Sequence, residues 1–301
     1  MKVVVTGSSG FLGRHVVRQL LDSDMGVASF DLRPPEGGPL NGEQFYERNL
    51  LDQQDLEKAI KEAGPVHVLV WLAAHITQQR ESDTSTHEDI DLMVQAPLEF
   101  LKRLPDTLGS VVHISTIEVY GKPRNLPVDE THPTNPFTLY GVTKLCAEHF
   151  LRIACEKRGV KLCNLRVAFI YGPGQHQRNV IPIFLDCVKQ GKPPVIQGTG
   201  AEIRDDIFVK DIAVAIEQVI RKGAEGVFNI SSGRPHTLKD IADAACALSF
   251  RSIHPEILHR GGTWVDRWYA IDRARKAFGF DPKTDFSDGL KQMWDVLGGS
   301  S

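Results

Sequence analysis

Three glycines near the N-terminus constrain the fold more than any other feature of the sequence. They are Gly7, Gly10 and Gly13, in the segment TGSSGFLG. The residues just before them, 3–5, are all valine, as expected for a strand that is buried on both faces of a parallel sheet. The residues just after them place apolar side chains at helical spacing. A glycine-rich turn between such a strand and a helix is typical of a dinucleotide-binding unit.

Each glycine has a separate expected role in such a unit. Gly7 allows a tight turn, Gly10 lets the backbone approach a pyrophosphate, and Gly13 lets the helix pack closely against the strand. The free N–H groups at the start of the helix, around Phe11 and Leu12, then favour a bound phosphate. The alternative is a turn that only needs positive φ angles, and a second signal argues against it.

That second signal is an acidic residue at the end of the next predicted strand. The segment VASFD ends in Asp31, which is followed by Leu32 at the same expected site. A carboxylate about 20 residues after the glycine turn can accept hydrogen bonds from the adenosine ribose, and it repels a 2′-phosphate. This favours NAD over NADP. Arg33 can neutralise a phosphate, so acceptance of NADP stays open.

The rest of the chain alternates between apolar runs and helical patterns. This alternation predicts the α/β class, with a Rossmann-type doubly wound parallel sheet. We expect a NAD-binding domain of residues 1–165 with about 205–235, and a smaller, interwoven C-terminal substrate-binding lobe of about 166–204 and 236–301. Strands are predicted at 66–72, 111–115, 161–169 and 227–231, and helices at 52–63, 88–104, 140–157 and 209–222.

The composition argues against several other classes of protein. The chain of 301 residues carries a net charge of -3, whereas nucleic-acid-binding proteins usually have a basic excess. No apolar run reaches the ~18 residues of a membrane span, and no signal peptide is recognisable. The five cysteines are an odd number without a CxxC pair, as expected for reduced thiols. We therefore expect a cytoplasmic protein that binds no nucleic acid, membrane or metal.

Two later segments together predict acid–base chemistry. HISTIEVYG is a strand that runs into a loop and carries Thr116, and YGVTK begins a helix with Tyr140 and Lys144. Side chains four residues apart share a helix face, and an ammonium beside a phenol lowers the phenol pKa from near 10 towards working pH. Tyr140 can then move a proton at an oxygen that Thr116 holds, while a nicotinamide takes or gives hydride. A YxxxK pair alone is common by chance. Here it follows a glycine-rich turn and a strand that ends in a hydroxyl residue, and this order supports a catalytic role.

These segments resemble those of an extended short-chain dehydrogenase/reductase, in the NAD-dependent epimerase/dehydratase family that acts on nucleotide sugars. TGSSGFLG is similar to the family pattern TGxxGxxG, and YGVTK to YxxxK. STIEVYG is similar to S-[ST]-x-x-VYG, and LRVAFIYGPG to LR-x-x-x-VYGPG. GTGAEIRDDIFVKDIA resembles a segment of the sugar-nucleotide lobe. The matches run in order over some two thirds of the chain.

The resemblance implies roles for the matching polar residues. Tyr140 would transfer the proton, and Lys144 would bind the nicotinamide ribose and tune Tyr140. Thr116 would hydrogen-bond a sugar hydroxyl. Arg204 would grip the substrate diphosphate, which suits a guanidinium fork. The alternative for Arg204 is a surface ion pair with one of the two aspartates that follow it.

The resemblance also implies contacts from three loops. Asn49 and Leu50 would lie against the adenine, although a polar loop tip is the simpler interpretation of Asn49. His75 follows an Ala-Ala pair and would lie in a loop that contacts substrate, although a loop histidine with a structural partner is an equal alternative. Small or apolar residues at the end of the strand predicted at 66–72 would let the cofactor approach closely: Leu72, Ala73 and Ala74.

Two departures from the family pattern place the substrate in question. Dehydratases of the family have an Asp-Glu pair after the Thr, where this chain has Ile117 and Glu118. Ile cannot donate a proton, but Glu118 can still act as a base or bind a sugar hydroxyl; a loop salt bridge is the alternative. Many members have Asn at the position of Phe169, where it contacts substrate, and a phenyl ring cannot replace that bond.

Three functional hypotheses follow. The first is an NAD-dependent nucleotide-sugar epimerase, similar to UDP-glucose 4-epimerase, that works through a transient keto-sugar. The second is an NAD(P)-dependent sugar or nucleotide-sugar dehydrogenase or ketoreductase, or a dehydratase- or decarboxylase-type relative that uses Glu118. The third, an inactive NAD-sensing protein, is disfavoured by the intact set of Thr116, Tyr140 and Lys144. The family resemblance also implies a homodimer, through a bundle of the helices at 88–104 and 140–157.

Overall fold

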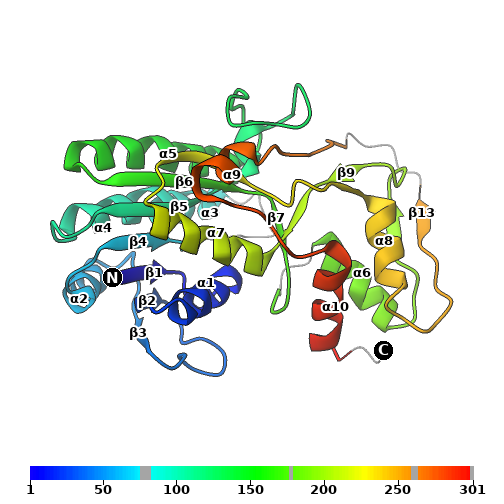
Figure 1. Cartoon of the computed structure of the whole chain (residues 1–301), viewed down its shortest axis with the longest axis horizontal. Coiled ribbons are helices and arrows are strands. Elements are labelled where there is room, and N and C mark those ends of the chain that lie inside the picture. The colour runs from blue at the N-terminus through cyan, green and yellow to red at the C-terminus, as the bar shows by residue number, and fades with distance from the viewer. Residues whose placement is uncertain (75–82, 176–178, 259–263, 299–301) are drawn as a thin grey trace.

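A seven-stranded parallel sheet forms the centre of the fold. Figure 1 shows helices on either side of it. The computed structural model describes residues 1–74, 83–175, 179–258 and 264–298. The strand order is β11-β6-β5-β4-β1-β2-β3, and every pair is parallel. This confirms the predicted Rossmann-type doubly wound sheet. The strands are β1 (Lys2–Thr6), β2 (Gly26–Asp31), β3 (Glu43–Glu47), β4 (Val68–Trp71), β5 (Ser110–Thr116), β6 (Lys161–Val167) and β11 (Gly226–Ile230).

Helices cover both faces of this sheet, which explains why its strands are apolar without alternation. On β1, Val3 and Val5 enter one core cluster and Val4 enters the other. The first face is covered by α1 (Phe11–Asp22), α7 (Val209–Lys222) and α9 (Asp272–Phe278). The second face is covered by α2 (Gln53–Ala63), α4 (Ala96–Arg103) and α5 (Leu139–Arg158).

Two predicted elements are interrupted. The helix expected at 88–104 is instead α3 (Asp83–Ile90), a π-helical segment η1 (Asp91–Gln95) and α4. Pro97, in the first turn of α4, has no N–H to donate to the preceding turn, which accounts for the widened π segment. The strand expected at 161–169 ends as β6 at Val167, where its pairing with β11 also ends.

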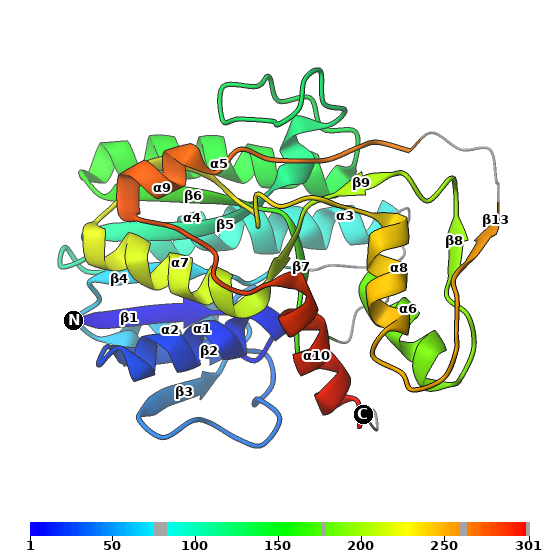
Figure 2. The same cartoon turned by 45° about the vertical axis from the view of Figure 1, so that its right-hand side comes forward.

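The chain beyond that break builds a second, smaller core. Strand β7 (Phe169–Tyr171) pairs with β10 (Asp206–Phe208) outside the main sheet. A third hydrophobic cluster joins α6 (Val180–Lys189), α8 (Leu238–Cys246) and α10 (Phe286–Val296), which lie together at one end of the molecule in Figure 2. The short strands of this region are β8 (Val195–Gln197), β9 (Ile203–Arg204), β12 (His236–Thr237) and β13 (Glu256–Leu258).

The predicted lobe boundaries stay a prediction, but the packing shows how interwoven the two regions are. Helix α9 falls inside the expected C-terminal lobe, yet its residues Ala274 and Phe278 belong to the core of the large sheet. None of the helices that the structure describes is long and apolar enough to span a membrane. Within the same described ranges, no group of three His, Cys, Asp or Glu side chains is arranged to hold a metal ion.

Candidate active site

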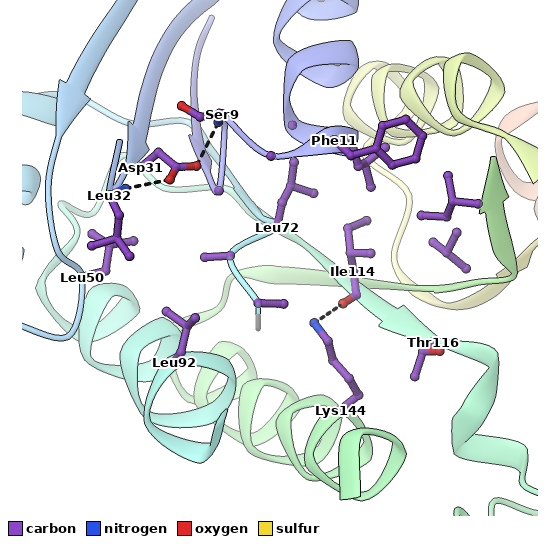
Figure 3. A pocket seen from close by; sticks show the side chains of 18 of the residues that line it. Ser9, Phe11, Asp31, Leu32, Leu50, Leu72, Leu92, Ile114, Thr116 and Lys144 are labelled. Carbon is purple, nitrogen blue, oxygen red and sulfur yellow. Dashed lines mark hydrogen bonds between the residues drawn. The ribbon is translucent and has the colours of Figure 1, made fainter. Parts of the chain in front are cut away.

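A cleft with a volume of about 1080 Å³ lies at the carboxyl ends of the strands, where the strand order reverses between β1 and β4. Ligands of doubly wound sheets bind at such a switch point. Figure 3 shows labelled side chains from the glycine turn, from the ends of neighbouring strands and from α5 around this cleft. Every residue predicted to bind the cofactor lines this cleft: Gly7, Gly10, Phe11, Leu12, Gly13, Asp31, Leu32, Asn49, Leu50, Leu72, Ala73, Ala74, Tyr140 and Lys144.

The three glycines of the turn are constrained for different reasons. Gly7 has a φ of +68°, and a Cβ there would lie 2.8 Å from the Ala73 nitrogen. A Cβ on Gly13 would lie 2.2 Å from the Gly7 carbonyl oxygen. Gly10 has an ordinary φ of -69°, and its nearest protein atom to a Cβ would be 3.3 Å away. The protein itself therefore requires glycine at positions 7 and 13, whereas at position 10 a side chain would need only a small adjustment of the backbone.

This turn and its surroundings fit a dinucleotide. Gly10 is the N-cap of α1 and provides no side-chain cap, so the first N–H groups of the helix are available to a pyrophosphate. Asp31 accepts hydrogen bonds from the N–H groups of Ser9 at 2.9 Å and Leu32 at 2.7 Å, as Figure 3 shows. These bonds hold the carboxylate at the rim of the cleft, where its remaining lone pairs can accept ribose hydroxyls.

The Tyr140–Lys144 pair lies on the opposite wall of the cleft, on α5. The Lys144 Nζ donates to the Ile114 carbonyl at 2.8 Å and lies 5.9 Å from the centre of the Tyr140 ring. Burial lowers the pKa of Lys144 to about 8, and the Glu148 carboxylate opposes that shift. Lys144 is thus an ammonium below about pH 8, at a distance where its charge favours the phenolate of Tyr140.

Hydrogen bonds connect Thr116 and Glu118, at and just after the end of β5, to the start of α5. The Thr116 Oγ1 accepts from the Glu118 N–H at 3.2 Å, so the hydroxyl of Thr116 can still donate its own proton. The Glu118 Oε2 accepts from the hydroxyl of Thr138 at 2.6 Å. Thr138 is the N-cap of α5, and its Oγ1 accepts from the Gly141 N–H at 3.1 Å. Glu118 therefore fixes the turn of helix that carries Tyr140.

Replacing Thr138 with valine removes both of these hydrogen bonds. We expect the free energy of unfolding to fall by about 1 kcal/mol, as for loss of an N-cap. We also expect kcat to fall several-fold, because Tyr140 lies in the turn that Thr138 caps. Chemical denaturation and steady-state kinetics measure the two effects. Thr138→Ser, which retains the hydroxyl, is the control; a Thr138→Val enzyme as stable and active as this control would contradict the role of the cap.

Phe169 and Arg204 form a stack at the edge of the cleft. The Arg204 guanidinium lies 4.0 Å from the centre of the Phe169 ring, and that of Arg267 lies 5.4 Å from it. Arg204 also makes two hydrogen bonds to Asp206, at 2.9 and 3.2 Å. This ion pair is buried rather than on the surface, and Arg204 is not part of the cleft lining, whereas Phe169 is. A role for Arg204 in binding diphosphate stays a prediction.

Some residues that line the cleft were not predicted from the sequence. One predicted site residue is not among the residues that the structure describes. His75 lies outside the described residues. Ser115 stands beside Thr116 and its hydroxyl made it a reasonable candidate, although strand alternation directs it to the other face of the sheet. Leu92 comes from the π segment, which the sequence pattern did not reveal. Asn179 and Arg48 also line the cleft and carry no motif.

Comparison with known proteins defines the family. The model of the NAD-dependent epimerase/dehydratase family matches residues 3–231. A putative UDP-glucose 4-epimerase of Methanocaldococcus jannaschii is 27% identical, over 97% of this chain and 96% of the relative. A dTDP-4-dehydro-6-deoxyglucose reductase of Escherichia coli is 26% identical, over 97% of this chain and 96% of the relative. The solved UDP-glucose 4-epimerase of Thermus thermophilus, in complex with NAD, is 26% identical with a TM-score of 0.86 over 100% of both chains. Since the family model covers most of the sequence, the chain belongs to the NAD-dependent epimerase/dehydratase family.

Proposed function

We propose that this enzyme is a nucleotide-sugar 4-epimerase that uses NAD and works through a transient keto-sugar. The observation that carries the proposal is the placement of Thr116, Tyr140 and Lys144 in the same cleft as the glycine turn. The epimerases among the related proteins support the choice of reaction, and their names support a UDP-sugar as substrate class.

The chain's own residues account for how the cofactor would be held. The open N-terminus of α1 at Gly10 would bind the pyrophosphate, Asp31 the adenosine ribose, and Lys144 the nicotinamide ribose. When bound, NAD supplies a hydride acceptor that can return the hydride to the sugar. Leu72, Ala73 and Ala74 would exclude water from this wall of the cleft because they present only small or apolar side chains.

The acid–base work would belong to α5 and the end of β5. In this proposal, the Tyr140 Oη accepts the proton of a sugar hydroxyl and later returns it to the same oxygen. The Lys144 ammonium stabilises the phenolate that this step requires. Thr116, nearly buried at the end of β5, orients the hydroxyl by hydrogen bonding.

One observation favours a second candidate, a reductase or dehydrogenase that exchanges its cofactor. Phe169 lines the cleft where many nucleotide-sugar enzymes have an amide, and a reductase is among the relatives at nearly the same identity as the epimerase. A dehydratase- or decarboxylase-type reaction through Glu118 is less favoured, because its carboxylate is already committed to the hydroxyl of Thr138.

The experiment that tests the proposal separates these candidates by the fate of the cofactor. The purified enzyme is denatured, any released nucleotide is identified by mass, and UDP-, GDP-, CDP- and dTDP-sugars are offered while NADH absorbance is followed. An epimerase holds NAD tightly, converts one sugar to its epimer and forms no lasting NADH. Steady formation of NADH would establish a dehydrogenase, and no turnover across the panel would exclude a nucleotide sugar.

We further propose that the enzyme is a homodimer that associates through α5. Four large apolar side chains are exposed along one face of this helix: Leu139, Val142, Phe150 and Ile153, with 52, 49, 49 and 44% of their surface accessible. Apolar residues at this spacing form a continuous stripe, and such a stripe on a soluble protein marks an interaction surface. A second copy of the same stripe is its natural complement in a two-fold dimer.

Replacing Phe150 with glutamate is expected to convert the dimer to a monomer, because two buried carboxylates would face each other across the two-fold axis. Sedimentation equilibrium measures the mass, which should fall from twice the chain mass to 33.4 kDa. Arg152→Glu, an even larger charge change on another face of α5, should remain dimeric. A wild-type enzyme that is monomeric at micromolar concentration would contradict the proposal directly.

A further inference from the structure

A buried ion pair lies directly beneath the Tyr140–Lys144 pair. Arg166 on β6 donates to both carboxylate oxygens of Glu148 on α5, at 3.0 and 2.8 Å. The hydroxyl of Ser115 also donates to this carboxylate, at 2.5 Å. Glu148 and Arg166 are only 5 and 6% exposed. A buried ion pair adds little stability over well-packed apolar side chains, so its presence here calls for another explanation.

The position of Glu148 on α5 offers an explanation for this buried ion pair. Tyr140, Lys144 and Glu148 are spaced four residues apart on α5 and therefore share one helix face. Adjacent residues of β5 contact two of them: the Ile114 carbonyl accepts from Lys144, and Ser115 donates to Glu148. The three ionisable groups thus follow one another along one side of α5, from half-buried Tyr140 to Lys144 and Glu148, which are buried against β5.

The charges around Lys144 make Glu148 its main electrostatic partner. Burial disfavours the ammonium, and the Glu148 carboxylate is the group that opposes this effect. His113 on β5 faces the same region, but burial lowers its pKa to about 3, so it is neutral at working pH. Arg166 on β6 is positive and is held by Glu148. Another charged group on an element that packs against α5 is Asp89, which is half-buried on α3.

We propose that Glu148 is a positioning residue of the catalytic site, whose carboxylate keeps Lys144 protonated and so favours the phenolate of Tyr140. Arg166 and Ser115 fix the carboxylate in place and share its charge. The proposal rests on the proton-transfer role of Tyr140 given above. The residues that control proton transfer would then include the buried Glu148 and Arg166 in addition to Tyr140 and Lys144.

This arrangement predicts opposite effects for the two halves of one ion pair. Removing the negative charge with Glu148→Gln destabilises the Lys144 ammonium, so the pKa of Tyr140 should rise, by about one unit. Removing the positive charge with Arg166→Gln leaves the negative charge of Glu148 without its neutralising partner. That charge then stabilises the Lys144 ammonium more strongly, so the pKa of Tyr140 should fall. Both variants break the same ion pair, so a purely structural role would give no such reversal of sign.

The test titrates Tyr140 directly, without substrate. The ultraviolet absorbance of tyrosinate is followed against pH, and the same titration of the Tyr140→Phe form of each variant is subtracted, which removes the other four tyrosines of the five in the chain. The decisive comparison repeats Glu148→Gln in a Lys144→Met background. There the upward shift should disappear, since Glu148 acts through the lysine.

The outcomes are distinct. Shifts of opposite sign that vanish without Lys144 support the proposal, and Arg166→Lys, which keeps the charge, should titrate like the wild type. Shifts of the same sign, no shift, or an upward shift that persists with Lys144→Met would overturn it. If one of the two variants does not fold, the other still gives a signed result. An enzyme that proves not to be an epimerase leaves the titration unaffected, so the two proposals fail independently.

Discussion

Replacing Tyr140 with phenylalanine is expected to lower kcat by about 10³-fold while leaving the fold unchanged. The substitution removes one oxygen from a half-buried side chain and keeps the ring in its place on α5. Proton transfer by a positioned side chain contributes roughly 10²–10⁴-fold to typical enzymes, and the proposed mechanism uses this oxygen for both transfers. The loss should therefore lie well within that range and should fall on kcat rather than on KM.

Three measurements distinguish this result from damage to the protein. The thermal midpoint and the amount of NAD retained on purification should match the wild type, because neither depends on the hydroxyl. Tyr46→Phe is the matched control, because it removes a tyrosine hydroxyl outside the cleft. The Tyr46 ring stacks on that of Phe30, with 5.2 Å between the ring centres. A Tyr140→Phe enzyme with more than a tenth of the wild-type kcat would exclude Tyr140 as the acid–base group.

The cofactor half of the cleft could be predicted from the sequence because it is built from local signals. Gly7, Gly10 and Gly13 stand in one turn between β1 and α1, so the motif consists of residues that are close together in the sequence. Asp31 ends the very next strand. Parallel strands bring their carboxyl ends to one edge of the sheet, so these segments meet in space without any further information.

The substrate half could not be predicted as well, because long-range contacts decide it. For Arg204, the hydrogen bonds to Asp206 are those of the ion pair that the sequence left open as the alternative, and binding of a diphosphate stays a prediction. Phe169 was expected at the end of a single long strand; β6 instead ends at Val167, and Phe169 begins β7, which pairs with β10. Glu148 carries no motif of its own, and only the fold brings Arg166 and Ser115 to it.

The second large effect is expected at Gly13, where alanine should prevent both folding of the turn and binding of the dinucleotide. The added Cβ would lie 2.2 Å from the Gly7 carbonyl oxygen and 2.7 Å from the Ser8 Cα. Both are backbone atoms, so the clash cannot be relieved by turning a side chain. We expect the free energy of unfolding to fall by about 3 kcal/mol, at the upper end of the cost of overpacking.

Gly10→Ala is the contrasting variant, because this position is not crowded by the protein. Its backbone is already in an extended conformation open to alanine, and the nearest contact of 3.3 Å needs only a small adjustment. Stability without NAD should stay within about 1 kcal/mol of the wild type. The methyl group would instead occupy the approach of the pyrophosphate, so the affinity for NAD should fall by about 10²-fold, or roughly 2.7 kcal/mol.

Chemical denaturation without NAD and calorimetric titration with NAD measure these two quantities separately. Loss of stability at Gly13 together with loss of affinity alone at Gly10 would show that the two glycines serve packing and ligand respectively. If Gly10→Ala bound NAD like the wild type, the pyrophosphate would have to lie elsewhere in the cleft. The first turn of α1 would then lose its assigned role, even though Asp31 and Lys144 could still hold the two riboses.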